Sequence, residues 1–112
     1  MPRNISFFLT TQQIRDRTKT VTRRLGWSFL KAGDVLNACV KCQGLGKGEK
    51  IEKICKIRVV SVRKEKLHEV TNAEVKKEGF ASAGKLDFIN MFTHSMKCKY
   101  DTIVNRIEFE YI

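Results

Sequence analysis

A long alternation of apolar and polar residues from Lys50 to Arg63 constrains the fold of this chain more than any other feature. A period of two over this length is typical of a β-strand with one face against a core. Apolar residues occur in both registers, so we expect a bulge or a strong twist partway along, as in the strands of a barrel. This strand is expected to form the centre of a sheet.

Three shorter segments are also predicted to be strands. Ile5–Leu9 is almost wholly apolar, as expected of a short strand that is buried on both faces. Val35–Cys42 follows a Gly-Asp turn, which is typical of the start of a strand. Thr102–Ile112 alternates again, and we expect one face to be buried and the other to be in water from Arg106 onward.

Short helices are expected between the strands. The first begins at Thr10 or Thr11 and ends near Arg17. The residues Thr71-Asn72-Ala73-Glu74 form a capping box for a second helix, which runs to about Glu78. Gly79 is placed to end that helix as a left-handed cap.

A third helix is predicted to begin at Ser82 or Gly84. Its apolar residues recur at helical spacing, and we expect this stripe to belong to the core and not to a cofactor site. The stripe consists of Leu86, Ile89, Met91, Phe92 and Met96.

Together these elements predict an α+β, mostly β architecture. Several short strands with two or three small helices favour a compact, closed β-barrel that carries its helices at one end. Closure would remove exposed strand edges in a chain too small to cover them. The length of 112 residues argues for one domain over residues 1–112.

The charge of the chain is strongly unbalanced. Lys and Arg number 22 against 12 Asp and Glu, a formal net charge of +10. This excess favours a polyanionic partner, with nucleic acid ahead of a membrane surface. No apolar run approaches the length of a membrane span, and Met1–Asn4 does not start a signal peptide, so a soluble, cytoplasmic protein is expected.

The densest group of cations lies in the stretch from Arg17 to Trp27, where threonines alternate with basic residues. Such cations repel one another, so the stretch is either a well-solvated face or an anion site. The threonine hydroxyls favour an anion site, because they offer directed hydrogen bonds that a solubilising face does not need. The candidate nucleic-acid contacts are Arg17, Lys19, Thr20, Arg23, Arg24, Trp27 and, from a later loop, Lys47.

Two of these segments have alternative interpretations. Trp27 is either a platform for base stacking or, as is commoner beside Phe29 and Leu30, part of the core. The Gly-rich segment Gln43–Lys50 has neither the spacing nor the following helix of a dinucleotide fingerprint. It is either a lid at the rim of a cleft or an ordinary hairpin connection.

Metal and cofactor sites are not expected. Cys39 and Cys42 have the spacing of a zinc knuckle, and His94 and Cys98 are the residues that would complete it. A zinc ribbon needs a second close pair, which this chain lacks, so the cysteines are expected to be free thiols in a reducing compartment.

Several short motifs occur together along the chain, and their combination resembles the ASCH domains of the PUA-like group of small β-barrels. The motifs are Phe7-Phe8, Gly33-Asp34, Glu78-Gly79-Phe80 and Ile107-Glu108-Phe109. In the ASCH signature G-x-K-x-x-E-x-R, Lys19 takes the place of the lysine and Arg24 that of the arginine. Arg17 replaces the glycine, and Thr22 replaces the glutamate.

The resemblance implies a barrel with a cleft beside the first helix and a role in binding RNA or nucleosides. A bacterial subgroup of small ASCH proteins carries a threonine at the place of Thr22 and acts as an amidohydrolase on acylated cytidine nucleosides. Its proposed catalytic lysine, threonine and glutamate correspond to Lys19, Thr22 and Glu78. Residues three apart in a regular strand point to opposite faces, so the first two meet only if the chain turns there.

Three functions follow as hypotheses. The primary one is an RNA- or nucleotide-binding domain that holds its ligand in a basic cleft, because an enzyme for a neutral nucleoside gains nothing from a net charge of +10. The alternative is hydrolysis of acylated cytidine by Lys19, Thr22 and Glu78. A zinc-bearing adaptor is the third.

Many acidic residues lie in the second half, which places the expected anion site near the first helix and the Gly-rich loop.

Overall fold

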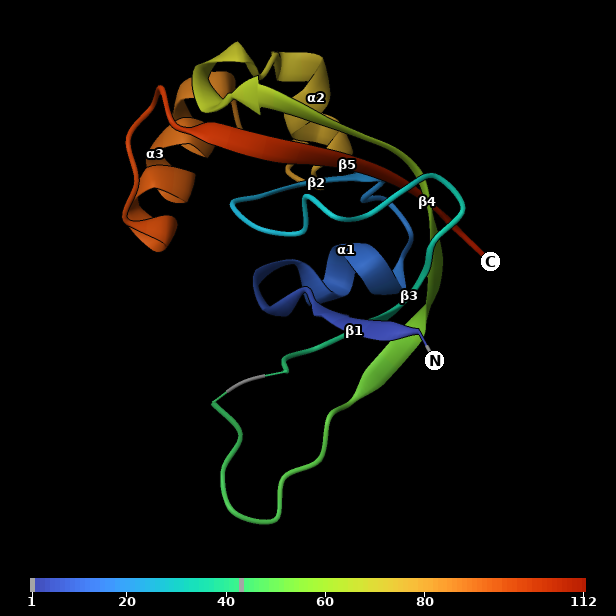
Figure 1. Cartoon of the computed structure of the whole chain (residues 1–112). Helices are drawn as coiled ribbons and strands as arrows, with labels where there is room; N and C mark the ends of the chain where they lie inside the picture. The colour runs from blue at the N-terminus through green and yellow to red at the C-terminus, as the bar shows by residue number, and fades with distance from the viewer. Residues whose placement is uncertain (1, 43) are drawn as a thin grey trace.

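The computed structural model describes residues 2–42 and 44–112 (Figure 1), so Met1 and Gln43 lie outside the described residues. Its five strands form one mixed sheet in the order β1-β3-β4-β5-β2. Only the β1–β3 pair is parallel, and the other pairs described are antiparallel. The strands are β1 (Arg3–Ser6), β2 (Val21–Arg24), β3 (Val35–Cys39), β4 (Lys53–Lys66) and β5 (Ile103–Tyr111).

The helices are short and occupy two places. In Figure 1, α1 lies inside the curl of the sheet, while α2 and α3 cover the end where β4 finishes and β5 begins. The helices are α1 (Thr11–Arg15), α2 (Asn72–Lys77) and α3 (Lys85–Met96), with 3-10 turns η1 (Phe8–Thr10) and η2 (Leu67–Glu69). Residues 2–42 and 44–112 contain no helix that is long and apolar enough to cross a membrane.

The long strand β4 is the centre of the sheet, as predicted. It pairs with β3 through its first part and with β5 over most of its length. Its register against β5 shifts between Val59 and Ser61, which confirms the bulge expected from the two overlapping apolar registers. The strand spans 53–66 and not 50–63, so it begins and ends three residues later than predicted.

The sheet curls into a half-barrel, which confirms the predicted small α+β, PUA-like fold but not full closure of the barrel. In the part of the chain that the structure describes, the edge strands β1 and β2 share no backbone ladder. A side chain bridges them instead, because Arg24 of β2 donates a hydrogen bond from Nη2 to the carbonyl oxygen of Ser6 in β1.

Several predicted boundaries need correction. The first strand ends at Ser6, and the chain turns into η1, which leaves Phe8 and Leu9 62% and 63% exposed. The strand predicted over Val35–Cys42 ends at Cys39, beside a register shift against β4.

The apolar stripe of α3 is also different from the prediction. Leu86 is 73% exposed and Met96 is 43% exposed, whereas Phe88 is buried with Ile89 and Phe92. Phe88 and Phe92 are four residues apart and therefore share one face of the helix, which Leu86 does not.

The core consists of two clusters, one under the curled sheet and one between the helices and the start of β5. The first contains Ile5, Phe7, Ile14, Leu30, Leu36, Ala38, Ile57, Val59, Ile107 and Phe109. The second contains Leu67, Val70, Val75, Phe88, Ile89, Phe92 and Val104.

The turn after α2 fixes the position of Glu78. Thr71 caps the helix as predicted, since its hydroxyl accepts a hydrogen bond from the backbone N–H of Glu74. The carboxylate of Glu74 does not return the bond but turns inward to two arginines. Gly79 has φ of +102°, which confirms the left-handed cap. The chain reverses there, close to α1.

Candidate active site

Lys19 enters the interior because the chain bends sharply between α1 and β2. Arg17 has φ of +63°, and the backbone N–H groups of Thr18 and Lys19 both donate to the carbonyl of Gln13, which closes the helix. Lys19 lies before β2 and Thr22 lies within it. The rule that residues three apart in a regular strand point to opposite faces therefore does not apply to this pair. The two side chains line the same cavity, and they are 3% and 4% exposed.

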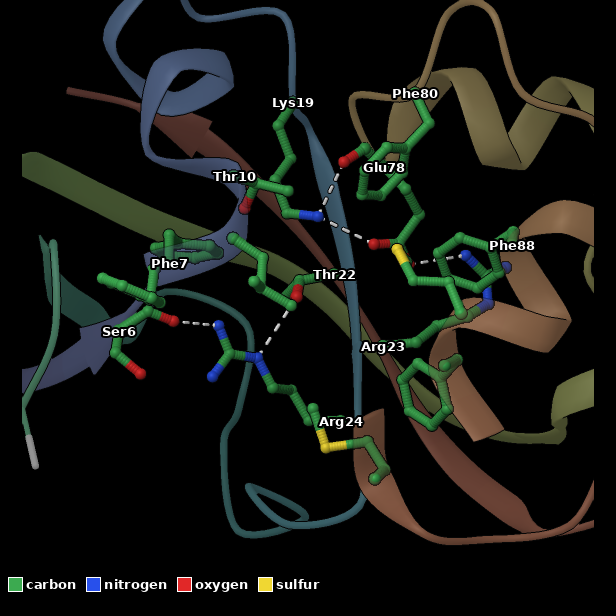
Figure 2. Close-up of a pocket in the computed structure, with 15 residues that line it drawn as sticks. Ser6, Phe7, Thr10, Lys19, Thr22, Arg23, Arg24, Glu78, Phe80 and Phe88 are labelled. Carbon is green, nitrogen blue, oxygen red and sulfur yellow. Dashed lines mark hydrogen bonds and ion pairs between the residues drawn. The ribbon is translucent and has the colours of Figure 1, made fainter. Parts of the chain in front are cut away.

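Lys19 and Glu78 form a buried ion pair. The Nζ atom of Lys19 donates to Glu78 Oε1 and to the backbone carbonyl of Glu78, each at 2.7 Å (Figure 2). Both side chains are 3% exposed. These two bonds hold the amino group in one orientation, and in the part of the chain that the structure describes its third hydrogen-bonding position has no partner.

Arg23 holds the other oxygen of Glu78 in place. Its guanidinium donates to Glu78 Oε2 at 3.0 Å, to Glu65 at 2.7 Å and to Glu74 at 2.8 Å. The side chain is 0% exposed. Arg23 therefore does not present its charge to solvent or to a phosphate, the role expected for it from the sequence.

Arg106 completes this charge network from β5. It donates to both carboxylate oxygens of Glu74, and it is 4% exposed, so the face of β5 predicted to be in water is covered at this residue. The hydrogen bond from Arg106, helped by one from Arg23, lowers the pKa of Glu74 to about 2 against the opposing effect of burial. Buried charges are tolerated when each has such a partner.

Burial also changes the acidity of the two cations in the cavity. Desolvation lowers the pKa of Lys19; the charge and hydrogen bond of Glu78 oppose this effect, and the charges of Arg24 and Arg23 add to it. A lysine with a lowered pKa gives up its proton more easily than an exposed one, as a general base requires. Desolvation likewise lowers the pKa of Arg24 to about 10, which keeps it cationic at neutral pH.

The Thr22 hydroxyl lies between these two cations in the view of Figure 2. Arg24 Nε donates to Thr22 Oγ1 at 3.2 Å, and the guanidinium carbon of Arg24 lies 4.9 Å from the centre of the Phe7 ring. Because the hydroxyl accepts from Arg24, its own proton is free to be donated elsewhere.

These polar groups form one end of a cavity of about 190 Å³ between the two core clusters. Most of the remaining wall is apolar, so a few polar groups converge inside an aromatic pocket, the usual design of a small-molecule site. The apolar lining residues are Phe7, Phe8, Leu9, Phe80, Phe88, Met91, Phe92 and Met96. The stripe of α3 expected to be core thus also forms a wall of the site.

The other predicted nucleic-acid contacts lie outside this cavity. Arg17 is exposed beside the Tyr111 ring, 5.4 Å from its centre, and Lys47 is exposed in the loop before β4. Thr20 pairs through its backbone with Lys77 and Phe109. Trp27 is half-buried against the first core cluster.

Sequence reasoning missed much of the supporting network. No local motif pairs Glu65 or Glu74 with Arg23, or Arg106 with Glu74. One signal was present: Arg106 is the only charged residue between Ile103 and Ile107 in an otherwise well-buried strand.

No metal site is evident among these groups. Residues 2–42 and 44–112 contain no cluster of three or more His, Cys, Asp or Glu side chains able to hold an ion. The four cysteines, all within the described residues, are free thiols.

A curled five-stranded sheet with α1 in its curl and a partly open cavity beside it defines a small PUA-like α+β fold of the ASCH type. The crystal structure of an ASCH domain from Lactobacillus crispatus JV V101 matches with a TM-score of 0.62 and 16% identity, over 97% of this chain and 78% of that one. Protein EF3133 from Enterococcus faecalis V583 matches with a TM-score of 0.72 and 16% identity, over 100% of this chain and 80% of that one. The fold is therefore ASCH-like. No family model matches the sequence, and no curated protein matches it.

Proposed function

We propose that this protein is an amidohydrolase that removes the acyl group from an N-acylated cytidine-type base. The observation that carries the proposal is the convergence of Lys19, Thr22 and Glu78 in one partly open cavity with aromatic-rich walls. The resemblance of the Lys19–Arg24 segment to small ASCH amidohydrolases supports the choice of substrate.

In this proposal Thr22 is the nucleophile and Lys19 is the base. The neutral amine of Lys19 accepts the hydroxyl proton while Thr22 Oγ1 bonds to the acyl carbon. The carbon–nitrogen bond then breaks, and Lys19 returns the proton to the leaving nitrogen. Water next attacks the threonyl ester while the neutral Lys19 amine takes one of its protons. Lys19 then passes this proton to Thr22 Oγ1 as the ester carbon–oxygen bond breaks and the carboxylic acid leaves. The net reaction consumes an amide and water and yields an amine and an acid.

Glu78 and Arg24 have supporting roles. Both oxygens of Glu78 are engaged, by Lys19 and by Arg23, so Glu78 positions the base and does not itself take up the substrate proton. Arg24 contacts Thr22 and carries a positive charge close to where the carbonyl oxygen becomes negative. Such preorganised charge stabilises a tetrahedral intermediate.

The size and charge of the cavity favour a single modified base over a polynucleotide. About 190 Å³ is less than the roughly 300–1,000 Å³ typical of drug-sized ligand sites. A planar ring with a short acyl group suits that space and its aromatic walls. Lys19 and Arg23 direct their charges at buried carboxylates, so they contribute little to a phosphate-binding surface.

RNA or nucleotide binding is the second candidate. The net charge of +10 and the exposed side chains of Arg17 and Lys47 favour it. It predicts affinity for RNA that falls steeply as salt is raised. The two candidates are compatible if the base to be deacylated belongs to a nucleotide.

The proposal is tested by mixing the protein with N-acetylcytidine and following the release of cytidine by chromatography. The wild type is expected to release cytidine, and Lys19→Ala is expected to release none while it retains the far-UV spectrum of the wild type. If the wild type leaves N-acetylcytidine intact but binds RNA in a salt-dependent manner, the second candidate replaces the first.

A further inference from the structure

A second cavity of about 530 Å³ adjoins the first one. The two share Ser6, Phe8 and Arg24 in their walls. Arg24 therefore lies at the junction, with its Nε on Thr22 and the rest of its guanidinium towards β1. The second cavity is completed by Asn4, Trp27, Lys41, Cys42 and Gly44.

The wall of the second cavity is rich in hydrogen-bond donors. Among the described residues that line it, Arg24 and Lys41 are cationic and none is a carboxylate. The amide oxygen of Asn4 accepts a bond from Asn37, which leaves the Asn4 amide nitrogen as a donor. Ser6 adds a hydroxyl. A cavity with two cations, several neutral donors and no acid favours an anion.

Both cations are available to a ligand. Within the residues that the structure describes, Nη1 of Arg24 makes no hydrogen bond, while Nε and Nη2 are used. Lys41 Nζ donates to the Gly44 carbonyl at 3.3 Å and lies 3.9 Å from Glu49, a distance at which its charge is only partly offset. The Lys41 side chain is 33% exposed and so remains accessible.

We propose that the second cavity holds the phosphate of a nucleotide whose acylated base occupies the first cavity. This inference rests on the proposed function and narrows its substrate class from nucleosides to nucleotides. Lys41 and Arg24 contact the phosphate, while Trp27 and Phe8 flank the sugar. A phosphate-binding site also gives part of the excess positive charge a role, whereas a neutral nucleoside substrate would leave that charge without one.

The phosphate in this cavity belongs either to a free mononucleotide or to a nucleotide within an RNA strand, and the experiment distinguishes the two. The proposal is tested with Thr22→Ala, which binds but does not cleave. Its affinity is measured by calorimetry for three ligands: N-acetylcytidine, its 5′-monophosphate, and a short oligonucleotide that contains the same base. One charge-assisted contact is worth about 1.5–3 kcal/mol, so the monophosphate is expected to bind at least about tenfold more tightly than the nucleoside.

A second substitution locates the phosphate. Adding Lys41→Gln to the Thr22→Ala protein is expected to remove most of the preference for the monophosphate. Lys64→Gln is the matched control, because Lys64 is an exposed lysine of β4 that lines neither cavity, and it should leave the preference intact. Equal affinity for nucleoside and monophosphate, or a preference that survives Lys41→Gln, would overturn the proposal.

The outcomes separate this inference from the function on which it rests. Tight, Lys41-dependent binding of the monophosphate by a protein whose wild type cleaves none of the ligands would reject the hydrolase and support the phosphate site. Cleavage of the nucleoside, together with equal affinity for nucleoside and monophosphate, would support the hydrolase and reject the phosphate site. If the oligonucleotide binds more tightly than the monophosphate in a Lys41-dependent way, the source of the phosphate is RNA.

Discussion

Lys19 bonds Glu78 twice, through the carboxylate and through the backbone carbonyl, although the two residues are 59 positions apart. The pair joins the segment before β2 to the end of α2 and is almost fully buried. Buried ion pairs contribute little net stability compared with apolar residues of the same size. We therefore interpret this pair as part of the chemistry of the cavity and test it first.

The pH dependence of turnover should follow Lys19. Because its pKa is lowered by burial, the neutral amine becomes available below the ordinary lysine pKa of about 10.4. We expect kcat/KM to rise with pH and to level off below that value. Lys19→Arg keeps the charge but remains protonated, so it should be inactive over the same range. A rate that is independent of pH, or an active Lys19→Arg, would contradict the assignment of Lys19 as the base.

Removing the Glu78 charge should destabilise the protein strongly. Glu78→Gln leaves Lys19 and Arg23 without their shared carboxylate in a buried site, and such a loss typically costs about 3–5 kcal/mol. Glu52→Gln is the control, since Glu52 pairs with Arg15 at the surface, where their side chains are 63% and 48% exposed. An exposed pair of this kind contributes less than about 1 kcal/mol to the free energy of unfolding. Urea unfolding gives the free energy of unfolding of both variants. An equal loss of that free energy in Glu78→Gln and Glu52→Gln would contradict the prediction.

Acid should weaken the fold through Glu74. Its pKa is lowered to about 2 in the folded protein, so the unfolded chain takes up the proton first as pH falls. The stabilising contribution is complete above the unfolded pKa of about 4.3 and is lost as pH falls towards about 2. Melting temperatures measured from pH 6 to pH 2 should therefore fall less steeply for Glu74→Gln than for the wild type. Parallel curves would contradict this role.

Gly79 should not tolerate a side chain. At φ of +102° any other residue is strained, and an added Cβ would lie 2.8 Å from Cγ of Gln13. We expect Gly79→Ala to cost about 1–3 kcal/mol and to lower turnover by shifting Glu78. Gly26→Ala provides the comparison, because among the described residues no atom beyond its chain neighbours lies within 4 Å of its Cβ position, and its φ is not in the left-handed range. Similar denaturation midpoints for the two variants would contradict the prediction.

The elements with strong local patterns could be predicted from the sequence. The alternation around β4 gave the central strand and its bulge, and the Thr71 and Gly79 signals gave the ends of α2. The end of β1 could not be found in this way, because Phe8 and Leu9 continue an apolar run although both are exposed. Their exposure depends on η1, a turn that places them at the rim of the cavity.

The candidate site was only partly accessible to sequence reasoning. Lys19 and Thr22 were identifiable from a short motif, and the structure brings them into one cavity with Glu78. The direction of Arg23 was not predictable, because its three carboxylate partners come from β4, from α2 and from the residue directly after α2, more than forty positions later. A cluster of cations in sequence is therefore a poor guide to surface charge when acidic partners are distant in the chain.

The central claim is that Thr22 carries the acyl group during turnover. Brief mixing with N-acetylcytidine, followed by acid quenching, digestion and mass spectrometry, should find an acetyl group on the peptide that contains Thr22. Cytidine release should fall at least about a thousandfold in Thr22→Ala, and remain in Thr20→Ala, whose threonine lines neither cavity. Undiminished release of cytidine by Thr22→Ala would contradict the account.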